Sequence, residues 1–62
     1  MNVTLHELAS AVEAGVAYVV LTGDSVSAAA AMAADNFELD ALEREVCERA
    51  IQQRLAEAVH ER

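Results

Sequence analysis

Few residues in this chain could carry out chemistry, and the most suggestive pair lies near its end. Glu57 and His60 are three positions apart, so on a helix their carboxylate and imidazole share one face. Carboxylate-bridged di-iron bundles use this spacing, and an antiparallel hairpin could bring His6 and Glu7 to the same end. A solvated helix face carries the same residue types, and we favour that interpretation. We therefore expect no metal and no cofactor.

The single cysteine, Cys47, excludes an intrachain disulfide. It has apolar neighbours and no histidine at a helical spacing that would activate it, so we predict a small buried hydrophobe rather than a nucleophile. The chain has no glycine-rich phosphate loop, no G-x-S-x-G elbow, no cysteine pairs at zinc spacing and no basic or aromatic surface for nucleic acid. These features favour an interaction protein over an enzyme.

Charge is divided unevenly along the chain. Residues 1–43 hold seven of the eleven carboxylates and no basic residue, whereas all four arginines lie in residues 44–62. The net charge of −7 therefore belongs to the first two thirds of the sequence. Such a surface repels nucleic acid and anionic lipid and steers a protein towards basic partners.

The composition predicts an all-α fold. The chain has fourteen alanines, no proline, one phenylalanine and one tyrosine, and alanine has the highest helix propensity. Thr4 and Glu7 have the spacing of a capping box, and Gly23 suits a helix C-cap. Apolar side chains recur every three or four positions between them. We predict a helix over about 5–22, followed by a turn at 23–25.

Residues 16–21 leave one alternative open. Their β-branched side chains could form a strand after a helix that ends at Gly15, and such a strand would have to pair with another copy of the chain. The helical spacing continues through Gly15, and the sequence has no other strand candidate. We therefore favour the helix.

The rest of the chain is predicted to be helical from about residue 26 to 60, with Asp24 or Ser25 as its N-cap. This segment is either one long helix or two helices joined near Asn36, because Asp35 and Glu38 repeat the capping-box spacing. In both forms the topology begins as a helical hairpin.

Small residues in both helices predict close packing within the hairpin. The alanine block of residues 28–34 can approach Ala14 and Gly15 of the first helix. The larger apolar side chains of the second segment would then extend beyond the first helix and need another cover. A second copy is the simplest cover, so we predict a dimeric helical bundle. Its predicted interface residues are Leu42, Val46, Ile51, Leu55 and Val59.

Residues 34–44, ADNFELDALER, followed by Ala50, Ile51 and Arg54, resemble the acidic N-terminal helix of the TraR/DksA-type regulators of phages and plasmids. That family inserts this helix into the secondary channel of RNA polymerase, so the resemblance implies transcription machinery as a target. The four-cysteine zinc module that follows the helix in that family is missing from this chain. The resemblance covers residues 34–54 alone.

We expect a small acidic interaction module, an inhibitor or regulator of phage or mobile-element type, that binds a basic surface of a larger protein. The alternative is an accessory subunit of a homo-oligomer or larger complex. The most apolar run, residues 14–21, is far shorter than the roughly 20 residues that cross a bilayer, so we expect no membrane partner. Because a basic n-region and a small-residue cleavage site are missing, we expect a cytoplasmic protein. Its acidity argues against a nucleic-acid partner. The predicted contact residues are Asp24, Asp35, Phe37, Glu38, Leu39 and Asp40.

Overall fold

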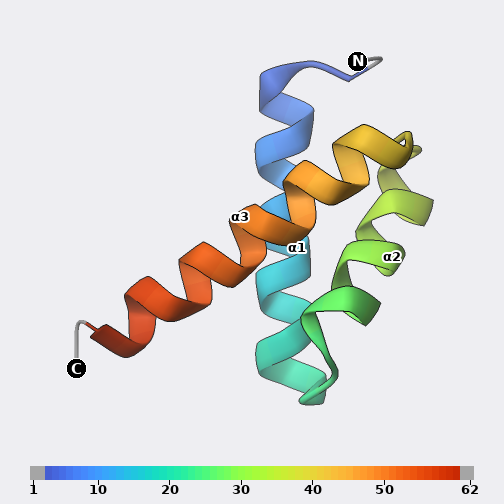
Figure 1. Cartoon of the computed structure of the whole chain (residues 1–62). Helices are drawn as coiled ribbons and strands as arrows, with labels where there is room; N and C mark the ends of the chain where they lie inside the picture. Colours follow the sequence, from blue (N-terminus) through green and yellow to red (C-terminus); the bar gives the residue numbers. More distant parts are fainter. Residues whose placement is uncertain (1–2, 61–62) are drawn as a thin grey trace.

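The computed structural model describes the backbone of residues 3–60 and the side chains of residues 3–59. Its helices are α1 (Leu5–Thr22), α2 (Val26–Phe37) and α3 (Ala41–His60). Figure 1 shows α2 returning beside α1 as a hairpin and α3 crossing α1 obliquely. The last turns of α3 extend beyond the hairpin. No strand occurs between residues 3 and 60, so the all-α prediction is confirmed, while the dimer stays a prediction.

Local capping interactions set both ends of α1 as predicted. The Thr4 hydroxyl accepts a hydrogen bond from the Glu7 N–H, and Glu7 Oε1 accepts one from the Thr4 N–H, both at 3.1 Å. Gly23 follows the helix in the left-handed region with a φ of 74°. Because α1 continues to Thr22, the alternative of a strand at residues 16–21 is wrong.

The second helical segment is broken, which is one of its two predicted forms. Ser25 caps α2, and α2 ends at Phe37. The capping box that begins the next helix lies at Asp40 and Glu43, five residues after the predicted one. Asp40 Oδ1 accepts a hydrogen bond from the Glu43 N–H at 2.7 Å, and Glu43 Oε1 accepts one from the Asp40 N–H at 2.9 Å. The stretch that resembles the regulator helix is therefore two helices here.

Small residues let the three helices approach one another. Ala29, Ala30 and Ala33 of α2 are fully buried. In the middle of α1, a Cβ atom at Gly15 would overlap Ile51 Cδ1 of α3 and would lie 3.9 Å from the Ala29 Cβ. The absence of a side chain at this position is what permits α3 to cross α1 so closely.

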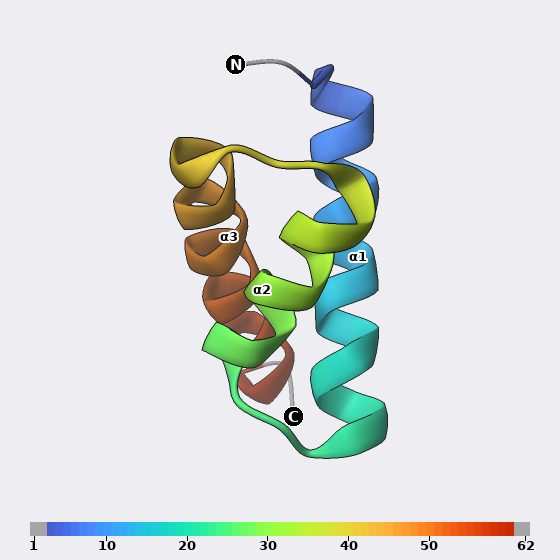
Figure 2. The ribbon, with the colours of Figure 1, turned by 90° about the vertical axis from the view of Figure 1, so that its right-hand side faces the viewer.

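The fold itself covers part of the apolar stripe that we expected another copy to cover. Ile51, a predicted interface residue, is fully buried inside the monomer, and Leu55 is half-buried against the core. The reason is that the first part of α3 folds back across α1, so that only its last turns extend beyond the hairpin; Figure 2 shows all three helices packed side by side. Leu42, Val46 and Val59 stay exposed, at 60, 39 and 72%.

Candidate interaction site

The predicted contact residues do not form one site. The turn residue Asp24 precedes α2, whereas Asp35 and Glu38 lie at the other end of this twelve-residue helix, roughly 18 Å away at 1.5 Å per residue. Asp24 is also occupied locally, since it accepts hydrogen bonds from the Ser25 N–H and the Tyr18 hydroxyl. We therefore remove Asp24 from the candidate site.

Two of the other predicted residues have structural roles. Asp40 caps α3 through the Glu43 N–H. Leu39 is half-buried and packs against the core. Both residues are half-buried, as Phe37 is, and their contact with a partner stays a prediction.

Phe37 and Glu38 instead share a hollow with residues from the start of the chain. The hollow has a volume of about 320 Å³ and is lined by Val3, Glu7, Phe37 and Glu38. Phe37 is half-buried and Glu38 is exposed. Asp35 lies one helical turn before Glu38 on the exposed surface. We call Glu7, Asp35, Phe37 and Glu38 the acidic end. Sequence reasoning missed Glu7, because nothing local indicates that α1 begins beside the end of α2.

Glu38 stands out for its backbone. Its φ of 55° and ψ of 46° place it in the left-handed region, and within residues 3–60 it is the one non-glycine residue with a positive φ. Its N–H caps α2 by donating to the Ala34 carbonyl. Glycine is the usual residue at such a C-cap because side chains are strained there.

Replacing Glu38 by glycine is therefore expected to stabilise the fold. The relief of strain exceeds the added chain entropy of glycine, so we expect the free energy of unfolding to rise by about 0.5–1 kcal/mol. Urea unfolding followed by circular dichroism measures the change. Asn36→Gly, within the helical part of α2, is the matched control and should lower stability by a similar amount. A fall in stability for Glu38→Gly would contradict the left-handed conformation.

Glu43 is the buried charged residue of the described chain, with no exposed surface. Its Oε2 accepts a hydrogen bond from the Val3 N–H at 3.0 Å, while its Oε1 accepts from Asp40. The carboxylate thus ties the segment before α1 to the start of α3. This link holds Val3, and with it one wall of the hollow, in place. The D-x-x-E spacing of Asp40 and Glu43 was the available sequence signal.

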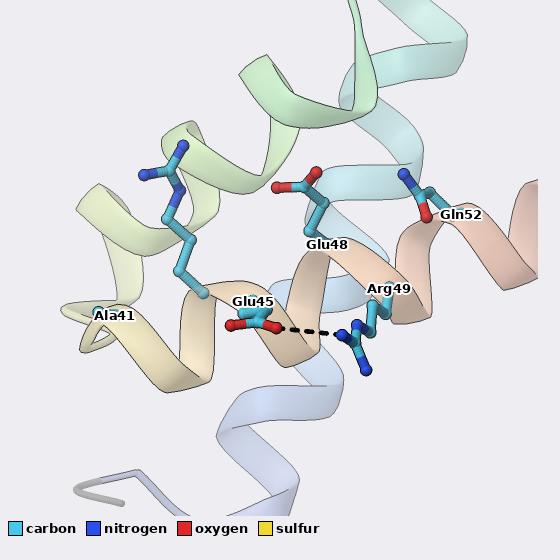
Figure 3. A pocket seen from close by; sticks show the side chains of 6 residues that line it. Ala41, Glu45, Glu48, Arg49 and Gln52 are labelled. Atoms are coloured by element: carbon cyan, nitrogen blue, oxygen red, sulfur yellow. Dashed lines mark hydrogen bonds and ion pairs between the residues drawn. The ribbon is translucent and has the colours of Figure 1, made fainter.

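Arg44, Arg49 and Arg54 lie along α3, where acids accompany them. A second hollow, of about 480 Å³, runs over the outer face of this helix. Figure 3 shows Glu45 and Arg49 joined on one side of α3, at 3.1 Å, with Glu48 and Gln52 standing on the other. Its full lining is Ala41, Arg44, Glu45, Glu48, Arg49 and Gln52.

One arginine reaches back from α3 to α1. Arg54 forms a hydrogen-bonded ion pair with Glu13, and this bond, together with the nearby positive charge, lowers the pKa of the Glu13 carboxyl. Both side chains are about half exposed, so the pair contributes little to stability. That contribution is present above the pKa of the unfolded carboxyl and is lost as the pH falls through the lowered pKa.

Neither candidate for chemistry gains support from its surroundings. Cys47 is fully buried, and burial raises the pKa of its thiol, which disfavours the reactive thiolate. No cluster of three or more His, Cys, Asp or Glu side chains suited to a metal occurs among the described residues. The side chain of His60 lies outside the described residues, and Glu57 accepts a hydrogen bond from Gln53 at 3.4 Å.

By length and composition, α1 could cross a membrane: it has 18 residues with a mean hydropathy of 1.2. Mostly buried core helices of soluble proteins and signal sequences near an N-terminus have the same properties, and 22% of this helix is buried in the fold. In this fold α1 contributes Leu8, Ala11 and Val12 to the core.

Comparison with known proteins adds no relative. No family model matches the chain, and no curated protein and no solved structure matches it either.

Proposed function

We propose that this chain is a small acidic interaction protein that regulates or inhibits a larger protein by binding a basic surface of it with the acidic end. One observation carries the proposal: the fold brings Glu7 of α1 into the same hollow as Phe37 and Glu38. The ion pairs found among the described side chains involve Glu13 and Glu45, not these acids.

The chemistry of the acidic end suits an arginine or lysine side chain. Phe37 offers an aromatic ring to the alkyl stem and the charge of such a residue. Glu38 offers its carboxylate to the head group, and Glu7 offers its Oε2, since its Oε1 accepts hydrogen bonds from Thr4. A half-buried aromatic residue surrounded by charges resembles the usual arrangement of an interface anchor and its polar rim.

The test compares how tightly the parent, the Glu38→Lys variant and the Glu57→Lys variant bind a basic partner protein from the source cell. Both substitutions change the net charge equally, and both positions are exposed, but Glu57 lies on α3 far from the hollow. We expect Glu38→Lys to weaken binding by on the order of tenfold or more and Glu57→Lys to have little effect. A combined Asp35→Lys/Glu38→Lys variant should abolish binding. Asp40 is left intact because it caps α3.

Salt provides an independent measurement. Association of the parent protein with the partner should slow as salt rises from about 0.05 to 0.5 M, because exposed charges are screened. Equal weakening by Glu38→Lys and Glu57→Lys, or binding that salt does not change, would contradict the acidic end as the contact.

An accessory subunit is the second candidate. Its supporting observation is an apolar surface between α1 and α3, a hollow of about 320 Å³ whose apolar lining is Val16, Val20, Leu55 and Ala58. In that role the acids keep the chain soluble, and binding to the complex would survive Glu38→Lys. Self-association as a dimeric helical bundle, with Leu42, Val46 and Val59 at the contact, is compatible with both roles and remains part of the proposal.

A further inference from the structure

We infer that the outer face of α3 is where a second copy of this chain binds, as an antiparallel pair of α3 helices related by a twofold axis. This inference rests on the proposed self-association but not on the acidic end. The outer face consists of the residues that line the second hollow, Ala41, Arg44, Glu45, Glu48, Arg49 and Gln52, together with the exposed Leu42 and Val46 beside them.

Charge favours a second copy at this face over the other described surfaces. The chain carries a net charge of −7, so two copies repel each other unless they meet where that charge is absent. In a twofold interface the same patch contacts itself, and a patch of one sign would oppose itself. The outer face of α3 holds two arginines and two glutamates and is neutral, so arginines of each copy can lie against glutamates of the other.

The packing of α3 directs this face away from the acids. Glu43, Cys47 and Ile51 form the buried side of α3, which packs on the hairpin. Leu42, Glu45 and Arg49 lie on the opposite side of the helix, while Gln52 and the half-buried Glu48 stand on its flank (Figure 3). A pair of α3 helices would therefore occupy the centre of the dimer, with the two hairpins outside. Each acidic end would remain free for a partner.

Exposed apolar side chains at this face supply the second element of an interface. Leu42 and Val46 are one turn apart on the same flank of α3, and Arg49 is nearly one turn further on. The charges around these apolar side chains sum to zero. Burying the apolar side chains against a second copy therefore contributes favourable free energy. The helices α1 and α2, beside which Glu7, Asp35 and Glu38 lie, contain no arginine, because residues 1–43 have none.

Two variants of opposite charge test the face. Arg44→Glu/Arg49→Glu makes it wholly acidic, and Glu45→Arg/Glu48→Arg makes it wholly basic. Sedimentation equilibrium from micromolar to millimolar concentration measures the mass of each. We expect the parent to form dimers, and each variant alone to dissociate at least tenfold more readily. An equimolar mixture should form heterodimers about as tightly as the parent forms dimers.

A third variant with all four charges exchanged has a neutral face again and should dimerise like the parent. Circular dichroism checks that every variant keeps its helices. If the parent is monomeric at millimolar concentration, the chain does not self-associate, and the outer face of α3 is not a dimer contact. If either double variant still dimerises alone, or if their equimolar mixture does not form heterodimers, the outer face of α3 is not the dimer contact. Neither readout involves a partner, so failure here is separate from failure of the acidic end.

Discussion

Shortening Ile51 to alanine is expected to remove most of the stability of this protein. The side chain is fully buried where α3 crosses α1, and such truncations cost about 2–5 kcal/mol. For a chain of 62 residues, total stability is roughly 3–9 kcal/mol at 0.05–0.15 kcal/mol per residue. Urea unfolding followed by circular dichroism should show a large fall in the midpoint. Val59→Ala, on the exposed part of α3, should change stability by less than about 0.5 kcal/mol.

A second comparison tests the crossing itself. Gly15→Ala adds a Cβ that would overlap Ile51 Cδ1, and overpacking of this kind costs about 1–3 kcal/mol. Ile51→Val removes that Cδ1, so Gly15→Ala should be better tolerated in the Ile51→Val background than in the parent. If the two changes simply add, to within about 0.5 kcal/mol, then α3 does not cross α1 at Gly15.

Glu43→Ala is expected to have the second largest effect, a loss of about 2–4 kcal/mol. The substitution leaves the part-buried N–H groups of Val3 and Asp40 without their acceptor, and a fully buried unsatisfied group costs about 1–3 kcal/mol. Urea unfolding measures the loss, and amide hydrogen exchange should show faster exchange at these two residues in particular.

Glu45→Gln is the matched control for Glu43→Ala. Glu45 is exposed and forms an ion pair with Arg49, and such pairs contribute about 0.3–0.5 kcal/mol. If Glu43→Ala were as mild as Glu45→Gln, with unchanged exchange at Val3 and Asp40, the carboxylate would not link the two ends of the fold.

The candidate site was only partly predictable. Phe37 and Glu38 were named because acids without nearby bases surround them, and this pattern is visible in the sequence. Glu7 was not named because it is 31 positions from Glu38, and its capping role explained it locally. Asp24 closes the turn before α2 and Asp40 caps α3, and charge along the chain does not show which acids have such local roles.

The sequence by itself determined that the chain is helical, both ends of α1, the start of α2 and the division of charge. These depend on interactions within a few residues: alanine propensity, the Thr4 capping box and the Gly23 C-cap. Only the tertiary structure decided that α3 folds back across α1, that Ile51 is buried inside the monomer, and that Glu43 reaches Val3 forty positions away. Contacts of this kind depend on the combined fit of many weakly interacting side chains, and no local pattern encodes that sum.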